Sequence, residues 1–259
     1  MSTAQDDLSL LIRAADSAGA VALSHHKGAL DIRYKSHDQS PVTDADHAVN
    51  ARLEEILRDA RPGYGWLSEE SPDSAERLDT EHVFIVDPID GTRSFIDGSR
   101  SWAHSIAVAR NGAVTAAVVY MPARGFLYAA ARGRGATLNG AAIRPSAQRD
   151  LEAATVLATK PTMRPEHWRD GIPSFQRNHR PSLAYRLSLV AEGRFDAMLT
   201  LRPAWEWDIA AGSLILSEAG AAVGDRRGAP LRFNNPHPQT DGVVTANPVL
   251  HDALLARLW

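Results

Sequence analysis

The chain of 259 residues contains no cysteine, which excludes disulfides, thiolate metal sites and cysteine nucleophiles. It also lacks any apolar stretch that approaches the roughly 18 residues of a transmembrane helix. Positive and negative side chains also nearly balance, because the formal net charge is only −3. Such a chain has no general attraction for nucleic acid or anionic membranes. Binding of an anionic ligand would therefore require local positive charge, such as a metal ion or a few cationic side chains.

The first residues, MSTAQDDLSLL, show neither the basic start nor the apolar run of a signal peptide. We therefore expect a cytoplasmic protein that binds neither nucleic acid nor a membrane. Apolar residues make up 44% and charged residues 23% of the chain, which is ordinary for a globular protein. The length suits one large domain or two closely packed subdomains.

Apolar residues at helical spacing predict a helix over residues 8–22 and a second one that begins after Thr43 or Asp44. The Asn111-Gly112 dipeptide lies between two apolar runs and predicts a β-hairpin. A second half begins near residue 150, and residues 161–180 are expected to form a loop with one short helix. Further helices are predicted at residues 183–191, 207–219 and 248–258. Helices and strands mixed in this order indicate layered α/β packing.

The segment VDPIDGT, residues 86–92, carries the clearest chemical signal. Asp87 ends an apolar strand predicted at 83–86, and Asp90 follows three residues later. The proline and glycine of the motif are expected to force the chain out of the strand. Two carboxylates and the carbonyl of Ile89 between them suit Mg²⁺, which prefers oxygen ligands. If a helix starts at the end of the motif, the N–H groups of Gly91 and Thr92 could hold a phosphate.

The same motif has a simpler interpretation, because an Asp-Pro-x-Asp-Gly run is often only a turn in which each Asp caps its own backbone. Ser68-Glu69-Glu70 favours the metal site, since it ends the preceding strand and two strand ends could meet at one sheet edge. Asp208 could cap the helix over 207–219 and ligate a metal with its other oxygen. The small residues 210–212 that follow it permit close approach of a neighbouring element.

A further acidic pair lies in SPVTDAD, residues 40–46. Asp44 is expected to serve as a helix cap. Asp46 lies inside the first turn, where we expect it to be freer to reach a neighbouring group.

Four motifs in order, SPVTDAD, WLSEES, VDPIDGT and WDIAAGSLILSEAGA, resemble the inositol monophosphatase family. This family lies within a larger group that includes fructose-1,6-bisphosphatases and bisphosphate nucleotidases. The resemblance extends over nearly the whole chain. It implies a layered α/β/α/β/α fold with two intimately packed subdomains, residues 1–150 and 151–259. It also implies two or three Mg²⁺ ions and a homodimer.

The resemblance also assigns roles to individual residues. It implies that the metal ligands are Glu69, Asp87, the carbonyl of Ile89, Asp90 and Asp208. Gly91 and Thr92 match the family's phosphate-binding positions, while Glu69, Thr92 and Asp46 match groups that hold or orient the attacking water. The expected function is hydrolysis of a small phosphate monoester by metal-activated water, without a covalent intermediate. Inhibition by Li⁺ is implied as well.

Two arginines suggest a substrate within the family. Many members that prefer inositol phosphates read Asp-Gly-Thr-Thr-Asn, whereas this chain has Arg93 after the Asp-Gly-Thr. Bacterial 3′(2′),5′-bisphosphate nucleotidases often carry a basic residue there, and another where this chain has Arg186. Two cations would suit a second phosphate. The preferred prediction is a nucleotidase acting on 3′-phosphoadenosine 5′-phosphate, followed by an inositol-1-monophosphatase and then a histidinol-phosphatase.

Two hypotheses of another class stay open at this point. One is a non-catalytic, metal-binding relative that acts as a regulatory partner, although all the matched ligands are present. The other is an unrelated α/β protein in which the acidic motifs are only turns. Each arginine also has a simpler interpretation as a solvated surface residue. Magnesium-dependent phosphate release from a generic monoester would separate the enzyme from both hypotheses.

Overall fold

The computed structural model describes residues 3–36 and 39–259. The α-helices of this part are α1 (Thr3–His25), α2 (Asp44–Ala60), α3 (Thr92–Ile96), α4 (Leu183–Ala191), α5 (Glu206–Ala219) and α6 (Pro248–Arg257). The larger sheet has the order β3 (Gly65–Ser68), β4 (His82–Asp90), β5 (Ala103–Arg110), β6 (Ala113–Met121), β7 (Phe126–Ala131), β8 (Ala136–Leu138) and β9 (Ala141–Ala142). The second sheet has the order β11 (Gln176–Asn178), β10 (Thr155–Leu157), β12 (Ala197–Thr200), β16 (Val243–Ala246) and β14 (Ala222–Gly224). Two short pairs join β1 (Ile32–Tyr34) to β2 (Pro41–Thr43) and β13 (Ala204–Trp205) to β15 (Gln239–Thr240).

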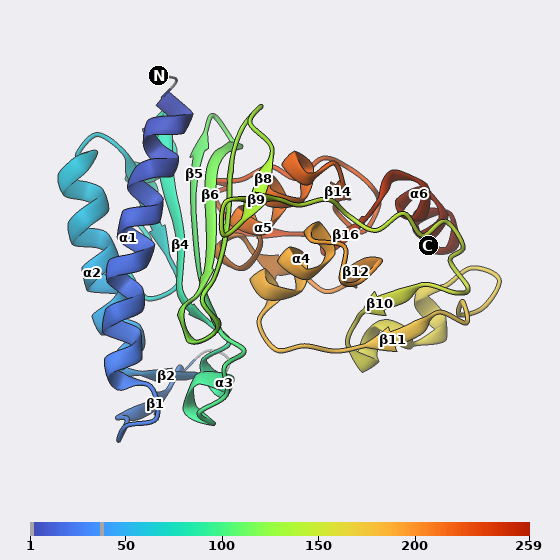
Figure 1. The fold of residues 1–259 in the computed structure, drawn as a ribbon, viewed down its shortest axis with the longest axis horizontal. Coiled ribbons are helices and arrows are strands. Elements are labelled where there is room, and N and C mark those ends of the chain that lie inside the picture. Colours follow the sequence, from blue (N-terminus) through green and yellow to red (C-terminus); the bar gives the residue numbers. More distant parts are fainter. Residues whose placement is uncertain (1–2, 37–38) are drawn as a thin grey trace.

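The elements stack in five layers (Figure 1). Helices α1 and α2 cover one face of the larger sheet, and α4 and α5 pack between its other face and the second sheet. Helix α6 covers the outer face of the second sheet. The α/β/α/β/α architecture predicted from the resemblance is therefore confirmed. None of the helices in the described residues has the length and apolar character needed to cross a membrane.

Helix α2 begins where the sequence predicts, with Thr43 as its N-cap, so the expectation that Asp44 is a cap is wrong. The side chain of Thr43 accepts a hydrogen bond from Asp46 N, and Asp46 Oδ2 accepts one from Thr43 N at 2.8 Å. This reciprocal arrangement is a capping box, which satisfies backbone donors at a helix start. Asp46 is thus less free than expected, because it caps the helix with one carboxylate oxygen.

Strand β4 runs further than expected, since it continues through the VDPIDGT motif to Asp90. Asp87 pairs with Ser105 and Asp90 with Ala103, so three steps on β4 face two on β5. A bulge of this kind tolerates proline, which cannot donate to the ladder. The expectation that the chain leaves the strand at residue 87 is therefore wrong. The bulge keeps both carboxylates on an ordered strand.

The hairpin predicted at Asn111-Gly112 is confirmed, as it joins β5 to β6. Its two residues have φ values of 50° and 80°, as a two-residue hairpin turn requires. In contrast, residues 161–180 do not form only a loop with a helix, because β11 lies within them. Its three polar residues pair in parallel with β10, and so short a polar strand has no alternation to reveal it in the sequence.

One apolar core joins the two halves of the chain. It contains residues of β3 to β8 from the first half together with residues of α4, α5 and β12 from the second. The prediction of close approach at residues 210–212 is confirmed at Gly212, where a Cβ atom would lie 2.5 Å from Leu187 Cδ1 on α4. The loop near residue 150 connects β9 to β10. The subdomain boundary itself stays a prediction.

Candidate active site

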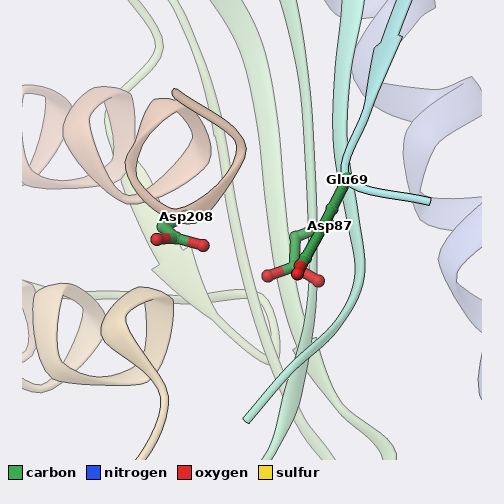
Figure 2. A group of neighbouring side chains, drawn as sticks. All are labelled: Glu69, Asp87 and Asp208. Carbon is green, nitrogen blue, oxygen red and sulfur yellow. The ribbon is translucent and has the colours of Figure 1, made fainter. Parts of the chain in front are cut away.

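Strands β3 and β4 are parallel neighbours, and β3 ends at Ser68 while β4 continues to Asp90. Ser68 pairs with Val86, and Glu69 N donates to Val86 O at 3.1 Å. This register places Glu69 beside Asp87, as the sequence predicts for two strand ends. The two acidic side chains point to the same side of the sheet (Figure 2).

Asp208 faces this pair from the first turn of α5 (Figure 2). The helix begins at Glu206 with Trp205 as N-cap, so Asp208 is not the cap that the sequence suggested. Its carboxylate is therefore not committed to the helix start. One ligand oxygen from each of Glu69, Asp87 and Asp208 lies within 4.8 Å of the others. The three residues come from three different elements, and we call them the carboxylate triad.

The electrostatic environment of the triad favours binding of a cation. Burial, together with the charges of Glu69, Asp90 and Asp208, raises the pKa of Asp87 well above its usual value. Burial and the charges of Asp90 and Glu69 likewise raise the pKa of Asp208. Oδ1 of Asp87 is buried and has no hydrogen-bond partner among the described residues. A divalent cation with oxygen ligands would satisfy this atom and relieve the repulsion, so the residues present fit such an ion.

Asp90 differs from the triad residues because one of its carboxylate oxygens binds the start of α4. Its Oδ2 accepts hydrogen bonds from Ser182 Oγ at 2.8 Å and from Ala184 N at 2.6 Å. One carboxylate oxygen therefore fixes the start of α4. Burial raises its pKa, while the bonds from Ala184 and Ser182 oppose that rise. Its role as a metal ligand stays a prediction that concerns its other oxygen.

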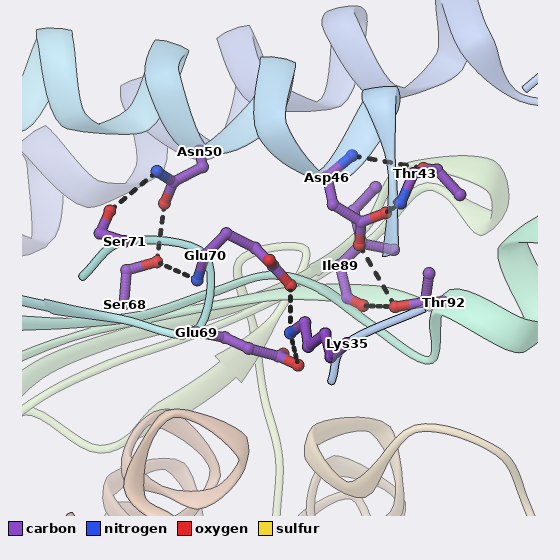
Figure 3. Close-up of polar contacts among 10 residues, drawn as sticks. All are labelled: Lys35, Thr43, Asp46, Asn50, Ser68, Glu69, Glu70, Ser71, Ile89 and Thr92. Atoms are coloured by element: carbon purple, nitrogen blue, oxygen red, sulfur yellow. Dashed lines mark hydrogen bonds and ion pairs between the residues drawn. The ribbon is translucent and has the colours of Figure 1, made fainter. Parts of the chain in front are cut away.

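A second group of polar contacts lies next to the triad (Figure 3). Thr92 Oγ1 lies 3.2 Å from Asp46 Oδ1 and 3.2 Å from Ile89 O. The carbonyl of Ile89 is therefore not entirely free, although its second lone pair can still serve a cation. Burial raises the pKa of Asp46. The pair of Thr92 and Asp46 that the resemblance singled out is brought together by α3 and α2.

Lys35 was not predicted from the sequence. Its Nζ donates to Glu69 Oε1 and to Glu70 Oε1, each at 2.7 Å (Figure 3). Burial alone would lower the pKa of Lys35, but the two carboxylates raise it above its ordinary value. Burial and the charge of Glu69 raise the pKa of Glu70 to about 7, although the hydrogen bond and charge of Lys35 act to lower it. A lone Lys in a polar loop offered no sequence signal for this contact.

The triad opens into a cavity of about 850 Å³. Glu69, Asp208, Gly91, Thr92 and Arg93 line it. Gly91 has φ of 101° and is the N-cap of α3, and a side chain there would approach Ser101 O to 3.2 Å. A residue other than glycine would therefore be strained at this position. Two predicted phosphate-binding residues thus border the same cavity as two triad carboxylates.

The two predicted arginines occupy different surroundings. Arg93 is exposed and lines the cavity. Arg186 is 8% exposed, and its Nε donates to Ser182 O at 3.3 Å. Its charge lies near Asp90 and Asp208, and it is not among the residues that line the cavity. A cation that sequence reasoning missed, Arg202, lines the cavity instead.

Comparison with known proteins decides the family. The model of the inositol monophosphatase family matches residues 4–259. The chain belongs to the inositol monophosphatase family. This family membership confirms the resemblance carried by the four motifs, and it makes the chain a member of a family of phosphatases.

Three curated relatives from this family carry different names. The Nus factor SuhB of Escherichia coli (strain K12) is 34% identical, covering 97% of this chain and 95% of the relative. The inositol-1-monophosphatase of Mesorhizobium japonicum is 34% identical over 83% of this chain and 81% of its own length. The histidinol-phosphatase of Mycobacterium tuberculosis is 34% identical over 98% of both chains. Family membership is therefore compatible with several substrates.

A solved structure agrees with the fold. The extragenic suppressor protein suhB from Bartonella henselae superposes with a TM-score of 0.81, at 29% identity and with 97% of each chain covered. The layered architecture of this family member is therefore the one found in its solved relative. The acidic cluster lies at the sheet edge where layered α/β proteins commonly bind ligands.

Proposed function

We propose that this family member is a Mg²⁺-dependent phosphatase that hydrolyses a small phosphate monoester with water as the nucleophile. The observation that supports the proposal is the carboxylate triad, in which a buried oxygen of Asp87 has no partner among the described residues. Glu69, Asp87 and Asp208 would hold Mg²⁺, with the Ile89 carbonyl and Asp90 as further ligands. A bound Mg²⁺ supplies charge that neutralises phosphate oxygens and lowers the pKa of water.

The chain's own residues would orient the reactants. Thr92 Oγ1 can donate its proton to Asp46, which leaves a lone pair to accept a hydrogen bond from the attacking water. Glu69 would hold the same water from the other side. Backbone N–H groups at Gly91 and Thr92 would bind the phosphate oxygens. Because α3 has only five residues, individual N–H donors would matter more than a helix dipole.

For the substrate, we propose a 3′(2′),5′-bisphosphate nucleotide, with inositol 1-phosphate and histidinol phosphate as alternatives. The exposed Arg93 supports a second phosphate, and Arg202 adds a cation to the same cavity. The names of relatives support the alternatives, since one is an inositol-1-monophosphatase and another a histidinol-phosphatase. A cytoplasmic location and a homodimer remain part of the proposal.

Metal removal is the first test. We expect EDTA to abolish phosphate release from glycerol 2-phosphate and from the three candidate esters, and excess Mg²⁺ to restore it, because carboxylates alone would repel an anionic ester. Phosphate release would be measured colorimetrically. Undiminished turnover in excess chelator would contradict the proposal. Absence of turnover on every ester with Mg²⁺ would favour a regulatory, non-catalytic relative.

The substrate proposal is tested at Arg93 and Arg186. If Arg93 contacts a second phosphate, Arg93→Ala should lower kcat/KM for 3′-phosphoadenosine 5′-phosphate by about ten- to a hundredfold, since a charge-assisted contact contributes roughly 1.5–3 kcal/mol. Inositol 1-phosphate should be affected much less. The same measurement with Arg186→Ala shows whether this buried arginine contributes to binding of the second phosphate. Equal losses on both esters would assign either arginine to the catalytic phosphate or to the fold.

A further inference from the structure

Two tryptophans next to the triad form a stacked pair. The rings of Trp205 and Trp207 lie 4.7 Å apart between centroids, with an interplanar angle of 9°. His237 lies against Trp205 at 5.5 Å and 58°. All three residues line the 850 Å³ cavity, and both indoles are only half-buried. Two stacked indoles and a tilted imidazole thus border the cavity immediately beside Asp208.

The stack is held in place by buried polar contacts. Glu206, between the two tryptophans, is fully buried, and its carboxylate accepts hydrogen bonds from Asn234 N at 2.6 Å and Asn235 N at 2.9 Å. Arg77 donates to Asn234 Oδ1 at 2.7 Å. The segment that leads into His237 is therefore fixed by two charged side chains. A rigid aromatic surface loses little conformational entropy when a ligand stacks on it.

The side chains on this side of the cavity favour a planar ring over a polyol. Apart from Asp208, the described cavity-lining residues between 202 and 238 include no carboxylate or side-chain amide. They are prolines, the two tryptophans, Arg202 and His237, whose Nε2 already lies 3.0 Å from Gln239 Oε1. Hydroxyl groups of a cyclitol would find few partners there, whereas a planar ring could stack on indole or guanidinium.

We infer that Trp205, Trp207 and His237 form a subsite for a planar heteroaromatic ring carried by the leaving group of the phosphate ester. The inference rests on the proposed phosphatase function and narrows its substrate class. A nucleotide base and an imidazole share this chemistry, and a cyclitol does not. Stacking on an aromatic side chain changes affinity by about five- to a hundredfold for a nucleotide base.

The test compares esters with and without a planar ring in wild-type protein and in Trp205→Leu. The ring esters are 3′-phosphoadenosine 5′-phosphate and histidinol phosphate, and the others are inositol 1-phosphate and glycerol 2-phosphate. We expect Trp205→Leu to raise KM for at least one ring ester about tenfold, with kcat nearly unchanged and both ringless esters unaffected. The ring ester whose KM rises shows whether the subsite binds a nucleotide base or an imidazole.

Two further variants separate stacking from a structural effect. Trp205→Phe keeps an aromatic face, so it should recover most of the affinity that Trp205→Leu loses. Trp259→Leu removes a tryptophan that is 66% exposed at the C-terminus, and it should leave every KM unchanged. Thermal unfolding of all variants shows whether the fold persists. If Trp205→Leu does not fold, His237→Ala takes its place, because it removes the exposed third ring of the subsite and should raise KM for the same ring ester while leaving both ringless esters unaffected.

Equal changes in KM for all four esters, or no change for any, would overturn the inference. So would a wild-type protein whose KM values for ring esters are no lower than for glycerol 2-phosphate. Failure of the proposed function looks different, because no ester would then release phosphate with Mg²⁺. The two failures can therefore be distinguished in one experiment.

Discussion

Replacing Asp87 with asparagine is expected to lower kcat by roughly a thousandfold or more, since it removes the central charge of the triad and with it the hold on the cation. Asn has almost the same shape, so the fold should persist. Steady-state kinetics with saturating Mg²⁺ and glycerol 2-phosphate would measure the loss. Near-normal turnover of Asp87→Asn would mean that the carboxylates of the VDPIDGT motif are only structural.

The same substitution should stabilise the metal-free protein. The pKa of Asp87 is raised in the folded state by burial and by Glu69, Asp90 and Asp208. A raised carboxyl pKa means that folding stability falls as the pH rises from the unfolded pKa to the folded pKa. At neutral pH in EDTA, Asp87→Asn should therefore unfold at a higher temperature than wild type. At about pH 4, where the folded protein keeps Asp87 protonated, the difference should shrink.

Replacing Gly212 with valine is expected to lower the free energy of unfolding by about 3 kcal/mol, because overpacking forces neighbours apart. A Cβ atom at Gly212 would lie 2.5 Å from Leu187 Cδ1 and 2.7 Å from Leu187 Cβ. Helix α4 would have to move away from α5. For a chain of this size the melting temperature should fall by roughly 6–12 °C.

A matched control is available at Gly63, where an added Cβ would meet no atom of the described residues within 4 Å. Gly63→Val should change the melting temperature by much less than Gly212→Val. Because α4 begins at the residues that bind Asp90, Gly212→Val should also lower phosphatase activity at a temperature where it is still folded. A Gly212→Val protein as stable as the Gly63→Val control would contradict the packing argument.

The sequence predicted best where one local pattern determines the structure. The hairpin at Asn111-Gly112 follows from a dipeptide that adopts positive φ, and the start of α2 follows from the capping preference of Thr43. The meeting of Glu69 and Asp87 was predicted because both follow apolar strand segments, and the parallel pairing of β3 and β4 places these two positions side by side.

Features that depend on distant residues were not predicted. Strand β4 continues through Pro88 because a bulge against β5 accommodates it, which the local signal of proline does not reveal. Lys35 reaches Glu69 and Glu70 through the hairpin of β1 and β2, so its partners lie more than thirty residues away. The ring stack could have been suspected from the Trp-Glu-Trp-Asp run, but the contribution of His237 comes from a separate loop.

The proposed function requires a cation that the carboxylate triad holds. The most direct test is the anomalous X-ray scattering of crystals soaked in Mn²⁺, under conditions in which Mn²⁺ replaces Mg²⁺ in the phosphatase assay. We expect an anomalous peak within bonding distance of the triad carboxylates in wild-type crystals and no such peak in Asp87→Asn crystals. Fully active wild-type crystals that show no peak at the triad would contradict it.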